Sequence, residues 1–289
     1  MSVYADNQGA RDSRTCPINR HKPMIRQFLG SAKRQSQHLF EVAQYGLSQK
    51  VSDPNRFVIF GRGRSGSTAL VSLLNALPNV HCDGEVLKES LIFPYFQILA
   101  KCQRSAAAVY GCKILSYQIR KIQPIPYGSV FLRDLYEDGF KIIYLKRDNL
   151  VQHAISIIRA KQYGFHQKVS DLPLGQNKPE KVRIDTNELL KLMQDSQALN
   201  QYERLVLSDI PHLALTYEAD MANERRQQRT VDKICDFLNI SRGRVTCQFR
   251  KVSPRQLSDS VSNYDEVVRF LARSSYIRYI RQDLLMTSQ

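Results

Sequence analysis

The sequence predicts an α/β protein in which a parallel sheet is covered by helices on both faces. Short apolar runs recur along the chain, and segments with helical periodicity separate them. The apolar runs do not alternate with polar residues, which is typical of strands that are buried on both faces. The 289 residues are enough for one large domain with a well-filled core. We therefore expect a single α/β domain.

The N-terminal part of the chain is predicted to stand apart from the sheet. Residues 1–23 are polar and rich in Arg, Asn and Asp, so we expect little regular structure there. Residues 24–48 fit an amphipathic helix, and turn-forming residues follow at 52–55. This pattern divides the chain into an N-terminal polar segment and helix, residues 1–55, and the α/β domain, residues 56–289.

The first strand of the domain is expected at Phe57 to Phe60. A glycine-rich turn follows it, and then a segment from Thr68 to Leu77 that is apolar nearly all round and is therefore predicted to be a buried helix. Further strands are expected at 109–115, 141–145 and 213–217.

The clearest helix is expected to begin near Asp185. Glu188 lies three residues further on, as in a capping box, and an apolar stripe with helical spacing follows. Residues 164–184 contain few apolar side chains, two prolines and several lysines, so they are expected to form a loop.

Charge and cysteine content narrow the class of protein. The net charge of +15 favours an anionic partner, which could be nucleic acid, a membrane surface or a phosphorylated ligand. No run of 18 apolar residues is present, so we expect no stable membrane insertion. The six cysteines are scattered and none forms a C-x-x-C pair, which is typical of reduced thiols in a cytoplasmic protein rather than of a zinc or redox site.

A phosphate-binding loop of the P-loop type is predicted directly after the first strand. Glycines allow the backbone N–H groups of such a loop to wrap around an anion, and the helix that follows adds the positive end of its dipole. Gly61 and Gly66 hold the two glycine positions of the nucleotide P-loop. The predicted ligand-binding loop consists of Gly61, Arg62, Gly63, Arg64, Ser65, Gly66, Ser67 and Thr68.

This loop lacks the lysine of nucleotide P-loops, because Ser67 takes its place. That lysine reaches the β- and γ-phosphates, so its absence argues against an ordinary ATPase, GTPase or kinase. Two arginines, Arg62 and Arg64, stand earlier in the loop, and a later strand ends in a pair of cations that includes Arg147. Asp148 follows and could bind Mg²⁺, but the paired cations favour an anion without a metal ion.

These motifs resemble those of the sulfotransferases that use 3′-phosphoadenosine-5′-phosphosulfate (PAPS), and most closely the bacterial carbohydrate sulfotransferases of the trehalose and nodulation-factor types. The resemblance extends from about residue 56 to about residue 280. Its motifs are the 5′-phosphosulfate loop at 64–68, a segment with a Gly-Glu pair at 80–85, a Gly-x-Lys strand at 110–114, a 3′-phosphate site at 144–148 and 152–156, and a C-terminal loop at 251–263.

The resemblance implies a reaction and its partners. A sulfuryl group would pass from PAPS to a hydroxyl of the acceptor by direct in-line displacement, with 3′,5′-ADP as the product and without a metal ion. The family favours a carbohydrate or glycolipid acceptor, although no motif identifies it, and suggests a homodimer.

The resemblance also implies roles for the cationic residues. Arg64 would contact the 5′-phosphosulfate and offset the charge that develops on the bridging oxygen. Arg147 and Ser156 would hold the 3′-phosphate, and Arg250 and Lys251 would reach it from the C-terminal loop. Arg147 and Ser156 lie nine residues apart, one more than in many members of the family.

The reaction requires a base for the acceptor hydroxyl. Glu85 is the first candidate, since it follows a glycine about one helix length after the loop, where the chain returns to the carboxyl edge of the sheet. His81 and Asp83 are rival candidates. Lys113 lies in an apolar strand, where an ammonium group is costly unless it meets an anion, so we expect it to stabilise the transferring sulfate or to hold the acceptor.

Two other functions remain open. A P-loop kinase or nucleotide hydrolase with a degenerate loop would require Mg²⁺. A non-catalytic nucleic-acid-binding protein would use the positive charge, but it would normally show a basic helix or a sheet with interleaved aromatic residues, and the sequence shows neither.

Overall fold

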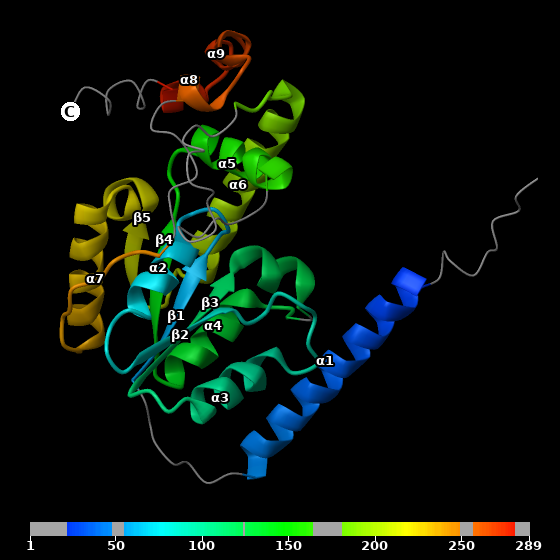
Figure 1. The fold of residues 1–289 in the computed structure, drawn as a ribbon, viewed down its shortest axis with the longest axis vertical. Helices are drawn as coiled ribbons and strands as arrows, with labels where there is room; N and C mark the ends of the chain where they lie inside the picture. The colour runs from blue at the N-terminus through cyan, green and yellow to red at the C-terminus, as the bar shows by residue number, and fades with distance from the viewer. Residues whose placement is uncertain (1–21, 48–54, 124, 164–180, 249–256, 281–289) are drawn as a thin grey trace, which may run out of the picture.

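A computed structural model describes residues 22–47, 55–123, 125–163, 181–248 and 257–280 of the chain. A five-stranded sheet lies at its centre and helices cover both faces (Figure 1). The strands are β1 (Asn55–Gly61), β2 (Val80–Glu85), β3 (Val109–Leu115), β4 (Phe140–Lys146) and β5 (His212–Thr216). Their order is β2-β3-β1-β4-β5, and all neighbouring strands are parallel. The predicted α/β fold class is therefore confirmed.

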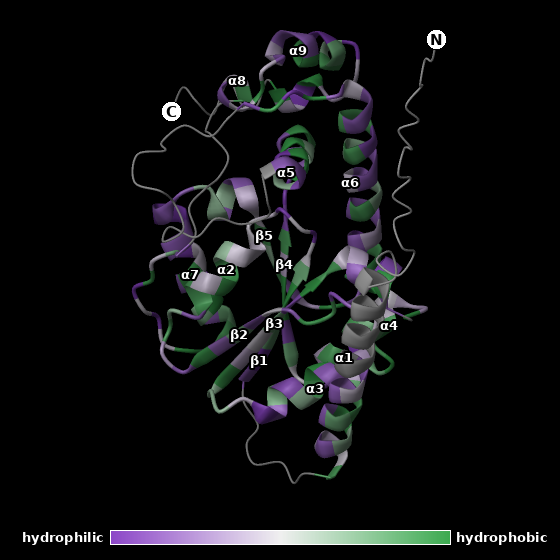
Figure 2. Cartoon of the chain, turned by 45° about the vertical axis from the view of Figure 1, so that its right-hand side comes forward, coloured by the Kyte–Doolittle hydropathy of each residue, from purple (hydrophilic) through white to green (hydrophobic). Residues whose placement is uncertain are grey.

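Helices cover both faces of the sheet, and others lie beyond its carboxyl end (Figure 2). They are α1 (Lys22–Leu47), α2 (Ser67–Leu74), α3 (Pro94–Arg104), α4 (Gly128–Glu137), α5 (Leu150–Tyr163), α6 (Thr186–Val206), α7 (Glu224–Leu238), α8 (Leu257–Ser260) and α9 (Tyr264–Ala272), with two π-helical turns, η2 (Gln118–Ile122) and η4 (Tyr217–Met221). Figure 2 shows α2 and α7 on one side of the sheet and α1, α3 and α4 on the other.

The central strand β1 shows why its sequence is apolar at consecutive positions. Phe57 and Ile59 pack in a cluster with residues of α2 and α7, whereas Val58 and Phe60 pack in a cluster with residues of α3 and α4. All four side chains are buried. Successive residues of a strand point to opposite faces, so a strand covered on both faces needs an apolar side chain at every position.

A third apolar cluster lies beyond the carboxyl end of β4. It joins residues of α5 and the first half of α6 to residues of α8 and α9 (Figures 1 and 2). Val182 belongs to this cluster and forms an isolated parallel bridge with Val261. Residues 164–180 of the predicted loop lie outside the described residues.

The four predicted strands correspond to β1, β3, β4 and β5, with small differences at their ends. The sequence analysis does not predict β2, because four of its six residues, His81, Asp83, Gly84 and Glu85, are not apolar and the strand shows no apolar run. Helix α2 ends at Leu74 rather than at Leu77. The amide groups of Ala76 and Leu77 bond three residues back, so the chain leaves the helix through a tighter turn.

The helix α1, close to its predicted bounds, packs on α3 through buried polar contacts. His38 Nδ1 lies 2.6 Å from Gln97 Oε1, and Gln97 Nε2 donates to Glu41 Oε2 at 2.7 Å. Arg104 pairs with the same oxygen of Glu41 at 2.9 Å. These contacts connect α1 to the sheet through α3.

The described helices and cysteines bear on membrane insertion and on disulfide formation. None of its helices combines the length and the apolar character needed to cross a bilayer. Free thiols occur at Cys82, Cys102, Cys112, Cys235 and Cys247.

The start of α6 agrees with the prediction in part. Asp185 is the N-cap residue, and its carboxylate accepts hydrogen bonds from the amides of Asn187 at 2.7 Å and Glu188 at 3.1 Å. The carboxylate of Glu188 pairs with Lys161 of α5 at 2.6 Å. Only one half of a capping box therefore forms, because Lys161 offers Glu188 an opposite charge.

Replacing Asp185 should therefore destabilise the protein through loss of the cap. Asp185→Ala is expected to lower the free energy of unfolding by about 1 kcal/mol, whereas Asp185→Asn keeps an acceptor and should lower it much less. Urea denaturation followed by circular dichroism measures both values. Equal stability of the alanine variant and the natural protein would contradict this account of the helix start.

Candidate active site

The predicted phosphate loop follows β1, and two of its glycines are required by their surroundings. Gly61 has a φ of +152°, and a Cβ atom there would lie 2.1 Å from the carbonyl oxygen of Leu145. Gly66 has a φ of +86° at the N-cap of α2, and a Cβ atom there would lie 2.9 Å from the ring of Tyr217. A side chain at either position would force the loop away from its neighbours.

Arg64 occupies an unusual backbone conformation within this loop. Its φ is +63°, in the left-handed region that residues other than glycine seldom adopt. Its Nε atom donates to Ser156 Oγ of α5 at 3.3 Å. Burial and the nearby charge of Arg147 lower the pKa of the guanidinium group. Strained residues of this kind concentrate at functional sites.

Arg147 lies beside Arg64 at the carboxyl end of β4 and is buried. Its Nη1 donates to the carbonyl oxygen of Arg64 at 3.4 Å, and its Nη2 donates to Gln152 Oε1 at 2.9 Å. Its Nε lies 3.7 Å from Glu218 Oε1, and its Cζ lies 4.6 Å from the centre of the Tyr217 ring. The guanidinium group is thus contacted on its face and on its edges.

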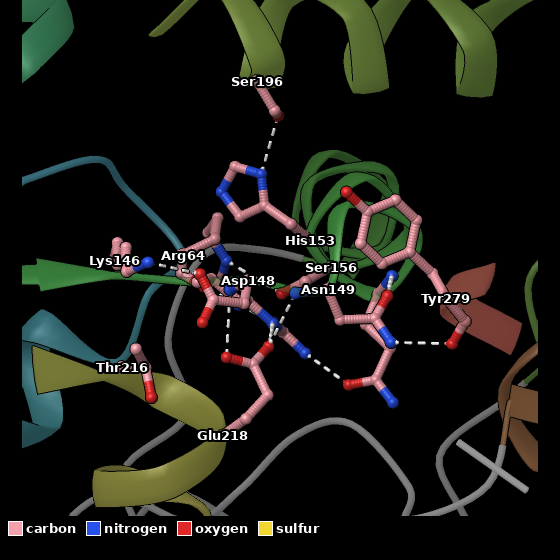
Figure 3. A network of polar contacts seen from close by, with 12 residues as sticks. Arg64, Lys146, Asp148, Asn149, His153, Ser156, Ser196, Thr216, Glu218 and Tyr279 are labelled. Atoms are coloured by element: carbon pink, nitrogen blue, oxygen red, sulfur yellow. Dashed lines mark hydrogen bonds and ion pairs between the residues drawn. The ribbon is translucent and has the colours of Figure 1, made fainter. Parts of the chain in front are cut away.

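The structure therefore brings together three of the predicted site residues, Arg64, Arg147 and Ser156. The close-up of this region shows Arg64 and Ser156 near the start of α5, with Glu218 reaching toward them from η4 (Figure 3). The nine-residue spacing between Arg147 and Ser156 does not separate them, since Arg64 contacts both residues.

Asp148, a possible ligand of Mg²⁺ in the sequence analysis, forms an ion pair with a lysine. Its carboxylate lies 2.8 Å from Lys146 Nζ. Across the ranges that the structure describes, no three or more His, Cys, Asp or Glu side chains gather so that they could hold a metal ion.

His153 anchors the loop to two helices. It is buried on α5, with Nε2 2.8 Å from the carbonyl oxygen of Gly63 and Nδ1 2.8 Å from Ser196 Oγ on α6. Burial lowers the pKa of His153 to about 3, so the ring is neutral near pH 7. A neutral ring that donates from Nε2 to Gly63 has its acceptor Nδ1 beside the hydroxyl of Ser196, which also lies 2.8 Å from the carbonyl oxygen of Leu192. The sequence analysis does not assign this role.

Arg62 is placed differently from the prediction. It is buried, and its Nη2 lies 2.9 Å from Glu203 Oε2 while its Nη1 donates to the carbonyl oxygen of Ser196 at 2.9 Å. Glu203 also accepts hydrogen bonds from Ser116 at 2.7 Å and from Tyr144 at 2.8 Å. The guanidinium group of Arg62 therefore points into the core, where it fastens the loop, and not toward a ligand.

On the other side of β1, the predicted base and lysine lie together. Lys113 Nζ is 3.1 Å from Glu85 Oε1 and donates to Thr68 Oγ1 at 3.1 Å. The second oxygen of Glu85 accepts a hydrogen bond from Gln118 Nε2 at 2.9 Å. Lys113 is buried and Glu85 is partly exposed. The ammonium group thus meets an anion, as its position in an apolar strand requires, and the pair contacts the phosphate loop directly.

A β-bulge brings Glu85 into this position. In the pairing of β2 with β3, Asp83 lies opposite Cys112 and Glu85 lies opposite Lys113, so Gly84 is the extra residue. Because side chains alternate between faces, a regular strand would have placed Glu85 on the opposite face from Lys113.

The rival bases lie elsewhere. His81 Nε2 is 3.3 Å from Asp83 Oδ1, and Asp83 also accepts a hydrogen bond from Tyr110 at 3.0 Å and lies 3.4 Å from Lys101. His81 pairs with Tyr110 near the amino end of β3. It lies four residues before Glu85, about 13 Å along an extended strand. Of the three candidate bases, Glu85 is the one that the described contacts connect to the phosphate loop, through Lys113.

The remaining predicted residues can be placed as follows. Ser65 and Ser67 are buried, and the hydroxyl of Ser65 has no hydrogen-bond partner among the described residues. Arg250 and Lys251 lie outside the described residues.

The sequence analysis also misses polar residues that contact the site. They lie at or just after the ends of predicted strands, which is the signal that could have identified them in a parallel sheet. These residues are Gln118, Tyr217 and Glu218. Gln152, within the predicted 3′-phosphate segment, contacts Arg147.

Comparisons with known proteins give limited information. No protein-family model matches the chain, and no curated protein is similar enough to count as a match. Among solved structures, the chain is similar to the mouse sulfotransferase SULT7A1 complexed with PAP, with a TM-score of 0.45 and 14% sequence identity. The similarity covers 80% of this chain and 90% of that chain. At this level, the similarity by itself assigns neither a family nor an activity.

The two arginines of the loop should differ sharply in their effect on stability. Arg62→Ala leaves Glu203 buried without its charge partner and should lower the free energy of unfolding by about 3–5 kcal/mol. Arg64→Ala removes a contact nearer the surface and should lower it by about 1 kcal/mol. Urea denaturation of both variants compares them directly, and similar losses would contradict the separate roles of the two residues.

Proposed function

We propose that this protein transfers a sulfuryl group from PAPS to a hydroxyl of an acceptor. The observation that carries the proposal is the arrangement around the loop that lacks the P-loop lysine. On the β4 side of β1 lie Arg64, Arg147 and Ser156, and on the β3 side lie Glu85 and Lys113. One side offers cations to an anionic donor, and the other offers a carboxylate to a hydroxyl.

The residues of the loop fit the phosphosulfate end of such a donor. The backbone from Gly63 to Thr68 leads into the N-terminus of α2, whose dipole favours an anion. The hydroxyl of Ser65 is buried and no described residue forms a hydrogen bond with it, so its hydrogen-bonding capacity is unused within the loop. Arg64 supplies positive charge at the same loop without a metal ion.

The 3′-phosphate would bind beside Arg147 and Ser156, which both contact Arg64. A guanidinium group suits the geometry of a phosphate because it donates in a fork. Arg250 and Lys251 complete this site in the proposal, as the resemblance to sulfotransferases implies.

In the proposed reaction, the acceptor oxygen forms a bond to sulfur as the bond from sulfur to the bridging phosphate oxygen breaks, and 3′,5′-ADP leaves. The carboxylate of Glu85 accepts the proton of the acceptor hydroxyl. Lys113 holds Glu85 and stabilises charge on the transferring group. Arg64 offsets the charge that develops on the departing oxygen.

The proposal extends to the organisation of the protein. Residues 56–289 form the catalytic unit, and residues 1–55 precede it. We propose a small-molecule or glycan acceptor, with a carbohydrate or glycolipid first, and a cytoplasmic homodimer that does not act on nucleic acid.

The donor site can be tested without an acceptor. We expect 3′,5′-ADP at about 100 times its Kd to stabilise the protein by about 2.7 kcal/mol in the presence of a chelator. Arg147→Ala should abolish most of the increase in melting temperature, whereas Arg204→Ala, which removes an exposed arginine of α6, should preserve it. Differential scanning fluorimetry measures each change.

A comparison of 3′,5′-ADP with 5′-AMP, which lacks the 3′-phosphate, shows whether that phosphate contributes to binding. Equal stabilisation by 5′-AMP and 3′,5′-ADP would rule out a dedicated 3′-phosphate site. Stabilisation that requires Mg²⁺ and ATP would instead identify a kinase or nucleotide hydrolase.

The base can be tested once a screen with labelled PAPS has identified an acceptor. Glu85→Gln keeps the shape of the side chain but removes the proton acceptor, so kcat should fall by roughly 10²–10⁴ while donor affinity stays nearly unchanged. Arg64→Ala should impair both donor affinity and kcat, because that charge acts on the bound donor and more strongly in the transition state. Steady-state kinetics with Glu137→Gln as an exposed control measures these effects, and a near-normal kcat for Glu85→Gln would exclude Glu85 as the base.

A further inference from the structure

The proposed anion site contains two guanidinium groups whose charges repel each other. Burial and the charge of Arg147 lower the pKa of Arg64; Arg147 is buried and Arg64 is partly buried. Such a pair keeps its geometry only if a counter-charge or fixed hydrogen bonds hold it. The carboxylate of Glu218 supplies a counter-charge, with Oε1 3.7 Å from Arg147 Nε.

The same carboxylate also holds the junction between β4 and α5. Glu218 Oε2 accepts a hydrogen bond from the amide of Asp148 at 3.0 Å, and Oε1 accepts one from the amide of Asn149 at 3.1 Å. These two residues directly follow Arg147, so one side chain fixes the backbone and the guanidinium group together (Figure 3).

The helix α5 does not need Glu218 as its cap. Asn149 already has this role, since its Oδ1 accepts a hydrogen bond from the amide of Gln152 at 2.9 Å. The amides that Glu218 binds lie before the helix begins at Leu150. The hydrogen bonds of Glu218 therefore do not serve as the N-cap of α5.

The turn η4 contacts Arg147 twice. Tyr217 places its ring against the face of the guanidinium group, and the next residue, Glu218, places a carboxylate at its Nε edge. Gln152 and the carbonyl oxygen of Arg64 contact the Nη groups. A binding group held in this way loses little freedom when its ligand arrives, which raises affinity.

We propose that Glu218 is a positioning residue of the anion site. It holds Arg147 and the first amides before α5 in the arrangement that receives the 3′-phosphate, and it thereby sets the preference for nucleotides that carry this group. This inference rests on the proposed function, because it takes a 3′-phosphorylated nucleotide as the ligand.

The test compares two nucleotides on the full-length protein by isothermal titration calorimetry. For Glu218→Ala, we expect the Kd of 3′,5′-ADP to rise about tenfold or more, as for loss of a charge-assisted hydrogen bond, and the Kd of 5′-AMP to change less than about threefold. Glu218→Gln keeps one acceptor oxygen but no charge, so its loss should be smaller. Glu224→Ala removes an exposed carboxylate from the first turn of α7 and should leave both values unchanged.

The ratio of the two affinities separates positioning from a general effect on folding. A Glu218 variant that weakens both nucleotides equally, or that binds 3′,5′-ADP as well as or better than the natural protein does, would overturn the inference. If Glu218→Ala does not fold by circular dichroism, Glu218→Gln gives the same comparison. A natural protein that does not distinguish the two nucleotides would refute the proposed function itself. A preference for 3′,5′-ADP that is as large in both variants as in the natural protein would refute only the role of Glu218.

Discussion

The buried ion pair between Arg62 and Glu203 is the interaction on which the candidate site depends. It joins the first turn of the phosphate loop to α6, and Glu203 receives further hydrogen bonds from Ser116, which follows β3, and from Tyr144 of β4. The ends of three neighbouring strands are thereby tied to one helix. Removing two charges from water is costly, and the surrounding hydrogen bonds offset that cost only in this geometry. Contacts within the protein therefore hold the loop in place without a ligand.

The order of the strands explains how the site separates its charges. Strand β1 carries the loop, and β3 and β4 lie on either side of it. Arg147 comes from the end of β4, whereas Lys113 and its partner Glu85 come from β3 and β2. Arg147 has its own carboxylate partner in Glu218, whereas Glu85 pairs with Lys113. In the proposed function, the parallel sheet would thus place a donor side and an acceptor side at one edge.

The sequence predicts those features that depend on local pattern. β1, β3, β4 and β5 are predicted because each contains a run of apolar residues, and β2 is not, because polar residues and a glycine interrupt its sequence. Glu85 and Arg147 are predicted from their places near the carboxyl edge of the sheet, and Lys113 from its charge within an apolar strand. The role of Arg62 could not be predicted, since its partner Glu203 lies 141 residues away. The bulge at Gly84 and the contacts of Glu218 likewise depend on how distant segments pack.

The two arginines of the loop show why charge alone is a poor guide to function. Arg62 and Arg64 lie two residues apart, yet the first enters the core and the second turns toward α5 through a left-handed backbone conformation. Only Arg64 adds positive charge where an anionic donor would bind, because the charge of Arg62 is neutralised by Glu203. Arg62 is thus one of the cations of this basic chain, with a net charge of +15, that stabilise the fold instead of adding charge at the site. In the proposed function, the preference for an anion would therefore come from the few cations that the fold directs to the loop, one of which pairs with the carboxylate of Glu218.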